Sequence, residues 1–335
     1  MQDRLLFLIS TPRSGSTLLM RILNATSQIY SRPESHIFPA LAHLGFYETV
    51  EKAPYDQLQA QDAIRDFVQE LPNGEETYYE ACRAYSDCLL SNMLAVASNG
   101  EKYYLEKTPA NALVLPFLTK IYPTAKYIVL TRHPAAIFAS YANSFFDGDY
   151  QAALAFNPIL SRYVPAIANF LRQKEVSFAH VSYEQLSTNP TEVLQQISSY
   201  LEIPYEPQAL NYKSATVSKG LGDPIGVDKH ERPVATSIHK WAQELASDKT
   251  KLDTVTTQLK WVSSDDLSTW GYPIENLWEP MKSVDSSAYQ SAKKDMNRYG
   301  LTRKALVWLR KDIHNRSLGN MVKRVRYYCD VLLRG

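Results

Sequence analysis

Residues 10–17 combine an arginine, a glycine and several hydroxyl side chains in one short segment. An unbroken apolar run, residues 5–9, comes before this segment and predicts a strand buried on both faces. Apolar residues at helical spacing follow it and predict a helix over 15–25. In a strand–loop–helix arrangement, the helix dipole and the first backbone N–H groups converge on an anion. The residues expected to bind a phosphate or sulfate group are Arg13, Ser14, Gly15, Ser16 and Thr17.

The loop differs from the nucleotide-hydrolase loop G-x-x-x-x-G-K-[ST], whose lysine contacts the β- and γ-phosphates. Here the turn is shorter, the lysine is missing and the arginine stands earlier. The segment P-R-S-G-S-T-L-L, residues 12–19, resembles the 5′-phosphosulfate loop of sulfotransferases that use 3′-phosphoadenosine 5′-phosphosulfate (PAPS). The alternative is an ordinary strand-to-helix turn with Arg13 on the surface. The resemblance implies PAPS as sulfuryl donor, PAP as product and no required metal.

Three further segments predict strands: residues 103–105, the apolar run 126–131, and residues 177–181. Strands that alternate with helices indicate an α/β fold in which ligands bind at the carboxyl ends of parallel strands. Lys107, Arg132 and Tyr183 each follow one of these strands, as Arg13 follows the first. We therefore expect a P-loop-like central parallel sheet flanked by helices, with these four side chains along one edge. Residues 150–173 are expected to be helical, with breaks at Pro158 and Pro165.

Arg132 and Ser140 are eight residues apart, and Pro134 suits the first turn of a helix that would carry Ser140. This spacing resembles the 3′-phosphate site of PAPS sulfotransferases. The alternative is that Arg132 forms a salt bridge on the surface and that Ser140 is a helix-interior serine without a function. The resemblance also implies that Tyr183 borders the nucleotide, where the alternative is a core tyrosine at a strand end. A basic residue of the late loop, Arg232 or Lys229, would close over the 3′-phosphate.

Glu34 lies 21 residues after Arg13, a separation similar to that of the catalytic glutamate in tyrosylprotein sulfotransferases. A carboxylate suits the reaction because an acceptor hydroxyl must lose its proton as it attacks sulfur. The alternative for Glu34 is a helix-capping or solvated loop acid. His36 is the second candidate for the base, since an imidazole titrates near neutral pH.

Lys107 lies 25 residues before Arg132, a second separation that resembles the tyrosylprotein enzymes. There the lysine faces the sulfuryl group and the leaving phosphate oxygen, where an ammonium stabilises charge that grows in the transition state. A surface lysine paired with Glu106 is the alternative.

The charge of the chain is divided unevenly. Residues 290–335 hold 12 Lys/Arg against 3 Asp, a net of +9, so the rest of the chain carries −8 of the overall +1. This balance argues against a nucleic-acid partner. Three cysteines without a metal or disulfide pattern, and no apolar run of spanning length, predict a cytoplasmic protein without a transmembrane segment.

We expect a sulfotransferase domain over residues 1–289 and a mostly helical, basic extension over 290–335. Within residues 301–334, apolar side chains recur at helical spacing in two stripes: Leu301, Ala305, Trp308, Leu309 and Ile313, then Met321, Val325, Tyr328 and Leu332. Attraction to the acidic body favours packing on it. Docking to a membrane surface or to a partner protein is the alternative for a basic amphipathic stretch.

The function expected from these residues is transfer of a sulfuryl group from PAPS to a hydroxyl or amine of a small-molecule natural product. A carrier-bound polyketide, a glycan or a peptide is an alternative acceptor. A P-loop nucleotide kinase is a weaker alternative, because the loop lysine and a magnesium-binding carboxylate are not evident. A non-catalytic binding module is disfavoured by the presence of both Glu34 and Lys107.

Overall fold

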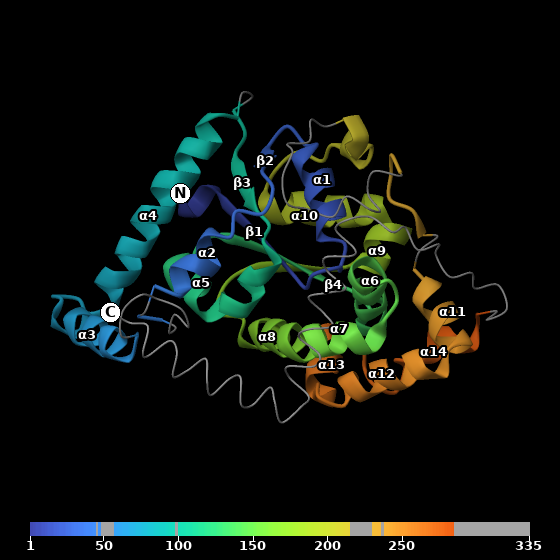
Figure 1. Cartoon of the computed structure of the whole chain (residues 1–335). Helices are drawn as coiled ribbons and strands as arrows, with labels where there is room; N and C mark the ends of the chain where they lie inside the picture. Colours follow the sequence, from blue (N-terminus) through green and yellow to red (C-terminus); the bar gives the residue numbers. More distant parts are fainter. Residues whose placement is uncertain (45, 48–56, 98–99, 215–229, 236–237, 285–335) are drawn as a thin grey trace.

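A parallel sheet organises the computed structural model of the chain (Figure 1). The structure describes residues 1–284 except 45, 48–56, 98–99, 215–229 and 236–237. Within these residues, five strands lie in the order β2-β3-β1-β4-β5. Their bounds are β1 Leu5–Ser10, β2 Ile29–Ser31, β3 Tyr103–Glu106, β4 Lys126–Thr131 and β5 Phe178–Ser182. Every neighbouring pair is parallel, so all five carboxyl ends meet at one edge.

Helices cover both faces of the sheet. The helices of the first part are α1 Ser16–Asn24, α2 Ile37–Ala42, α3 Gln57–Glu70, α4 Glu75–Ala95, α5 Leu115–Ile121, α6 Pro134–Phe146, α7 Tyr150–Phe156 and α8 Ile159–Gln173. Those of the second part are α9 Tyr183–Thr188, α10 Pro190–Leu201, α11 Lys240–Ser247, α12 Lys249–Leu259, α13 Ser264–Trp270 and α14 Glu279–Lys282. Short 3₁₀ turns are η1 Gln2–Arg4, η2 Pro109–Val114, η3 Pro207–Leu210 and η4 Tyr212–Ser214.

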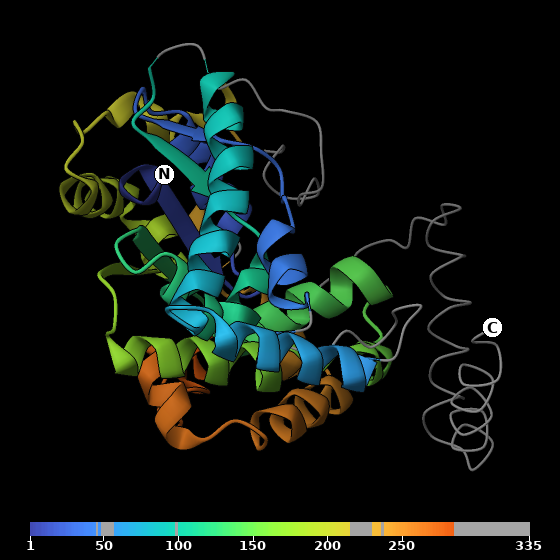
Figure 2. The same cartoon turned by 90° about the vertical axis from the view of Figure 1, so that its left-hand side faces the viewer.

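Two hydrophobic clusters separate these helices into layers. Leu6 and Leu8 of β1 point into a cluster with α1, α9 and α10, whereas Phe7 and Ile9 point into one with α4, α5, α6, α8 and α11. Figures 1 and 2 show helices on both sides of the sheet. Successive strand residues point to opposite faces, so a sheet covered on both sides needs unbroken apolar strands. The predicted α/β architecture with a central parallel sheet is therefore confirmed.

The expected break at Pro165 is wrong, whereas the break at Pro158 is confirmed. Pro158 is the N-cap of α8, and Pro165 lies inside that helix. An internal proline removes one helical hydrogen bond and costs about 3 kcal/mol. The flanking residues Tyr163, Val164 and Ile167 are buried against the core, and their packing offsets that cost.

The described helices include none that is both long and apolar enough to span a membrane. The predicted extension, residues 290–335, lies outside the described residues.

His133, at the start of α6, connects the C-terminal helices to the end of β4. Its ring stacks on Trp241 of α11 with ring centroids 4.0 Å apart, and it meets the edge of Tyr272. Its Nε2–H donates to the carbonyl oxygen of Leu277 at 2.8 Å. Burial lowers the pKa of His133 from 6.5 to about 4, so the ring is neutral near pH 7.

Acidification should therefore weaken the fold through His133. The unfolded chain binds this proton near pH 6.5 and the folded chain only near pH 4, so stability falls as the pH drops between these values. The contribution of His133 to this loss is about 3 kcal/mol. Urea unfolding at several pH values should give a shallower loss for His133→Phe, which keeps a ring against Trp241. The exposed His230→Phe should follow the unmodified protein; an equal acid loss in His133→Phe would contradict the assignment.

Candidate active site

The loop between β1 and α1 has a strained backbone. φ is +69° at Arg13 and +92° at Gly15, and the left-handed conformation costs a side-chain-bearing residue such as Arg13 about 1–2 kcal/mol. The buried hydroxyl of Ser14 holds the turn by donating to the carbonyl oxygen of Thr11 at 2.8 Å. No side chain of the described residues caps the N-terminus of α1, which begins at Ser16 directly after this loop. The first N–H groups of a helix have no partners within it, so this end can bind an anion.

Gly15 is required by its contact with Tyr183. A Cβ atom at position 15 would lie 2.4 Å from Cδ2 of Tyr183, well inside van der Waals contact. The same tyrosine ring carries the guanidinium of Arg132 over its face, 4.1 Å from the ring centroid. One aromatic ring at the start of α9 therefore contacts both the loop and the expected phosphate-binding arginine.

Arg13 links the loop to α6. Its Nε donates to Oγ of Ser140 at 3.2 Å, and its Nη2 donates to Oγ of Ser144 at 2.8 Å. Nη1 of Arg132 donates to the carbonyl oxygen of Arg13 at 3.0 Å. The structure thus brings Arg13, Arg132 and Ser140 together, with Ser140 bonded to Arg13.

Arg132 is a cation in surroundings that disfavour charge. Its carbonyl oxygen accepts a hydrogen bond from Nε1 of Trp270 at 2.8 Å, while its side-chain Nε is buried without a partner among the described residues. Burial lowers the pKa of Arg132, and the nearby Tyr183 and Glu184 oppose this shift. A buried guanidinium is stabilised by an anion, so this position favours an anionic ligand.

Glu34 and Lys107 form a direct ion pair. Nζ of Lys107 lies 2.6 Å from Oε1 of Glu34, and the lysine side chain is only 1% exposed. Their positions follow from the sheet, because β2 and β3 are paired with Ser31 opposite Leu105, and both residues follow these strand ends. His36 lies beside the pair, with Nε2 3.5 Å from the second carboxylate oxygen, Oε2 of Glu34. The His36 side chain is half exposed and can reach solvent.

Glu106 accepts hydrogen bonds from other side chains and does not form the ion pair with Lys107. Its Oε1 accepts hydrogen bonds from Oγ1 of Thr108 at 2.7 Å and from Nδ2 of Asn111 at 3.5 Å. Burial raises the pKa of Glu106, which favours a neutral carboxyl group. The ammonium of Lys107 is thereby directed to Glu34, and the alternative of a surface lysine paired with Glu106 is wrong.

The other residues expected to bind the donor differ in their burial and in whether the structure describes them. Ser16 and Thr17 are buried in the first turn of α1, next to the loop. Arg232 is exposed to solvent, and Lys229 lies outside the described residues. Over the described part of the chain, no group of three or more His, Cys, Asp or Glu side chains could hold a metal ion.

Sequence reasoning missed three supporting residues. Ser144 could have been found, because it stands one helical turn after Ser140. No local sequence pattern pointed to Trp270 or to Glu184 as part of the site. Trp270 reaches Arg132 across 138 residues of sequence, and Glu184 accepts from the backbone N–H of His133 at 3.1 Å.

Comparisons with known proteins identify a family for the chain. The Sulfotransferase family matches residues 6–207. Nodulation protein NoeE of Sinorhizobium fredii is 34% identical over 134 residues, which cover 40% of this chain and 30% of that protein. Protein-tyrosine sulfotransferase A of Caenorhabditis elegans is 21% identical over 305 residues, covering 86% of this chain and 75% of the relative. This chain thus corresponds to less than a third of the nodulation protein.

A solved structure supports the fold. The sulfotransferase domain from the Synechococcus PCC 7002 olefin synthase superposes with a TM-score of 0.50 at 24% identity, over 76% of this chain and 94% of that domain. The family match alone spans more than half of the chain, from β1 to the start of η3. The protein therefore belongs to the sulfotransferase family.

Proposed function

We propose that this sulfotransferase uses PAPS as donor and Glu34 as the general base that activates a hydroxyl, or an amine, of a small-molecule acceptor. The observation that carries the proposal is the 2.6 Å contact between Glu34 and the buried ammonium of Lys107. This contact pairs a carboxylate with a cation at the same sheet edge as the anion-binding loop. A base and a charge-stabilising group for sulfuryl transfer are then neighbours before any substrate arrives.

The residues fit a donor with phosphate groups at two positions. Buried polar atoms without a partner among the described residues gather at the strand ends: Oγ of Ser10, Oγ1 of Thr11 and Nε of Arg132. Such atoms are costly to bury unless a ligand completes their hydrogen bonds. PAPS, when bound, supplies a sulfuryl group activated by its bond to a 5′-phosphate.

Each residue then has a defined part in binding. The 5′ end would be held by the backbone and side chains of the loop: Arg13, Ser14, Gly15, Ser16 and Thr17. The 3′-phosphate would be held by Arg132 and Ser140, with Tyr183 against the nucleotide and Arg232 closing from the late loop. Among the described residues, no carboxylate forms an ion pair with the Arg132 guanidinium, so this group can bind a phosphate.

Glu34 and Lys107 would then act in one step. The acceptor oxygen forms its bond to sulfur while its proton passes to the Glu34 carboxylate. The bond between sulfur and the 5′-phosphate oxygen breaks, and its electron pair stays on the phosphate. When Glu34 takes the proton it loses its charge, and the Lys107 ammonium is released to stabilise the charge on the departing oxygen. His36 can carry the proton from Glu34 to solvent, because it lies against Oε2 of Glu34 and is half exposed.

Loss of Arg132 should weaken nucleotide binding. Arg132→Ala removes a charged hydrogen-bond donor worth about 1.5–3 kcal/mol, which corresponds to about 10- to 100-fold in the dissociation constant of PAP. Isothermal titration calorimetry with PAP measures this directly. Arg65→Ala, on the exposed surface of α3, is the matched control and should bind PAP as the unmodified protein does. Unchanged PAP binding by Arg132→Ala would remove Arg132 from the nucleotide site.

Turnover should depend on Glu34 while binding does not. Glu34→Gln keeps an oxygen that can accept from Lys107 but cannot take up a proton, so turnover should fall about 10²- to 10⁴-fold with PAP affinity retained. Labelled PAPS and a library of hydroxyl- and amine-bearing metabolites provide the assay. His36→Gln, which leaves the ion pair intact, should lose less activity. If His36→Gln is the more damaged variant, the base is His36 and the proposal for Glu34 is wrong.

A further inference from the structure

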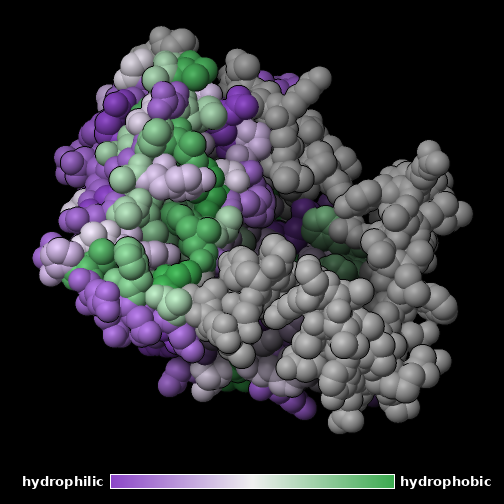
Figure 3. All heavy atoms as spheres, turned by 60° about the vertical axis from the view of Figure 1, so that its left-hand side comes forward, coloured by the Kyte–Doolittle hydropathy of each residue, from purple (hydrophilic) through white to green (hydrophobic). Residues whose placement is uncertain are grey.

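From Ala81 to its C-terminal end, the outward face of α4 carries a series of exposed apolar side chains, interrupted by Ser91 and Asn92. We call the α4 stripe the set of exposed residues Ala81, Tyr85, Cys88, Leu89, Ala95 and Val96, which recur at helical spacing. Tyr85 is 56% exposed, Leu89 42% and Val96 70%. Figure 3 shows hydrophobic side chains running down this side of the molecule. A surface helix normally carries polar residues on its outward face, so this one calls for a covering element.

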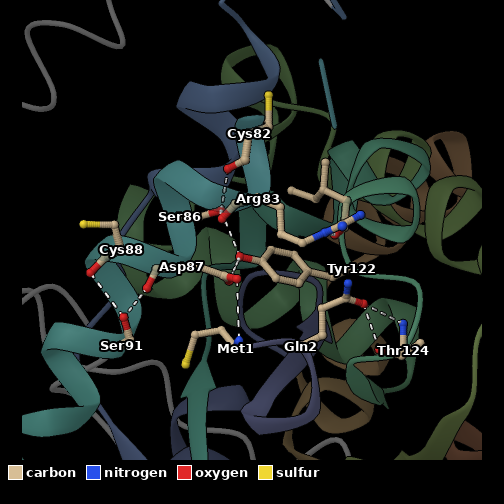
Figure 4. A network of polar contacts seen from close by, with 11 residues as sticks. Met1, Gln2, Cys82, Arg83, Ser86, Asp87, Cys88, Ser91, Tyr122 and Thr124 are labelled. Atoms are coloured by element: carbon tan, nitrogen blue, oxygen red, sulfur yellow. Dashed lines mark hydrogen bonds and ion pairs between the residues drawn. The ribbon is translucent and has the colours of Figure 1, made fainter. Parts of the chain in front are cut away.

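The inward face of α4 is firmly attached, so the helix cannot rotate to bury the stripe. The hydroxyl of Tyr122 donates to Oδ1 of Asp87 at 2.6 Å and lies 2.9 Å from Oγ of Ser86 (Figure 4). Buried Leu90 and Leu94 continue the same inward face. Figure 4 also shows the sulfur of Cys88 pointing away from this network.

The α4 stripe lies on an acidic unit. Residues 57–97, which comprise α3 and α4, contain seven Asp or Glu and two Arg, a net charge of −5. A second copy of the same surface would bring two groups of five negative charges together, which opposes pairing of the stripe with itself. A partner that combines apolar side chains with positive charge fits the surface better.

Residues 290–335 of the same chain have this combination. They carry a net charge of +9, and their apolar residues recur at helical spacing. The described chain ends at Val284, so residues 285–300 are available as a connection. Sixteen residues span up to about 50 Å when extended, comparable with the diameter of a domain of this size. We propose that the stripe formed by Met321, Val325, Tyr328 and Leu332 packs on the α4 stripe.

The cysteines of the chain provide a test. Cys82 is buried and Cys88 lies exposed on the α4 stripe, while Cys329 follows Tyr328 directly in the segment proposed to dock. Docking brings Cys329 next to Cys88 within one molecule. The full-length protein, treated at low concentration with a short bis-maleimide, should give a Cys88–Cys329 link in a monomer, identified by peptide mass mapping. Cys88→Ser should abolish it.

A charge placed in the stripe separates docking from chance proximity. Leu89→Glu puts a carboxylate at the centre of the α4 stripe, and the cross-link should then be largely lost. Hydrogen exchange over residues 301–334 should become faster in this variant. Leu44→Glu is the matched control, since Leu44 is also exposed, at 55%, but lies outside the stripe. It should leave both readouts unchanged.

Three results would overturn the proposal. A Cys88–Cys88 link would mean that a second copy covers the stripe. A Cys88–Cys329 link found only between molecules would mean that the segment docks on a neighbouring copy. No link, together with equal hydrogen exchange in Leu89→Glu and the unmodified protein, would mean that residues 321–332 do not bind this surface. None of these results bears on PAP binding or turnover, so the function proposed above is tested separately.

Discussion

The ion pair between Lys107 and Glu34 is the constraint on which the arrangement of the sheet edge depends. An ammonium that is 1% exposed needs a carboxylate within contact distance, and leaving such a charge buried alone costs about 3–5 kcal/mol. The pair can form only if β2 and β3 are adjacent and in register, since Glu34 and Lys107 follow these two strands. The Glu106 carboxyl group, whose pKa is raised by burial, accepts hydrogen bonds from Thr108 and Asn111 and does not compete with Glu34 for the ammonium.

The rest of the site extends this charge pattern across the sheet. Arg13 follows β1 and Arg132 follows β4, so cations stand at the ends of β3, β1 and β4, which are neighbouring strands. The carboxylate of Glu34 faces them from beyond the end of β2, and that of Glu184, after β5, lies near Arg132. An excess of positive charge in partly buried surroundings is stable only while hydrogen bonds or anions compensate it. Ser140 and Ser144 accept hydrogen bonds from Arg13, and the guanidinium of Arg132 lies over the aromatic face of Tyr183.

The sequence predicted the parts of this arrangement that depend on local pattern. Unbroken apolar runs located β1, β3 and β4, and residues 177–181 were also predicted as a strand, which is β5. Strand ends in a parallel sheet meet at one edge, so the grouping of Arg13, Lys107, Arg132 and Tyr183 followed. Contacts between distant segments were not predictable from pattern. The bond from Trp270 to Arg132 and the choice of Glu34 rather than Glu106 by Lys107 depend on tertiary packing. Pro165 failed as a break for the same reason, because burial of its neighbours in α8 outweighs the local preference.

The contact between Gly15 and Tyr183 restricts how the protein can evolve. Any side chain at position 15 needs the space that the tyrosine ring occupies, and removing the ring takes away the surface on which the Arg132 guanidinium rests. A single substitution at either position therefore produces a defect that the other position cannot repair by itself. A related protein that lacks the Gly15–Tyr183 contact would need different residues at positions 15, 183 and 132 together. Among descendants of this sequence, the three should be inherited as a unit even where the surrounding surface diverges.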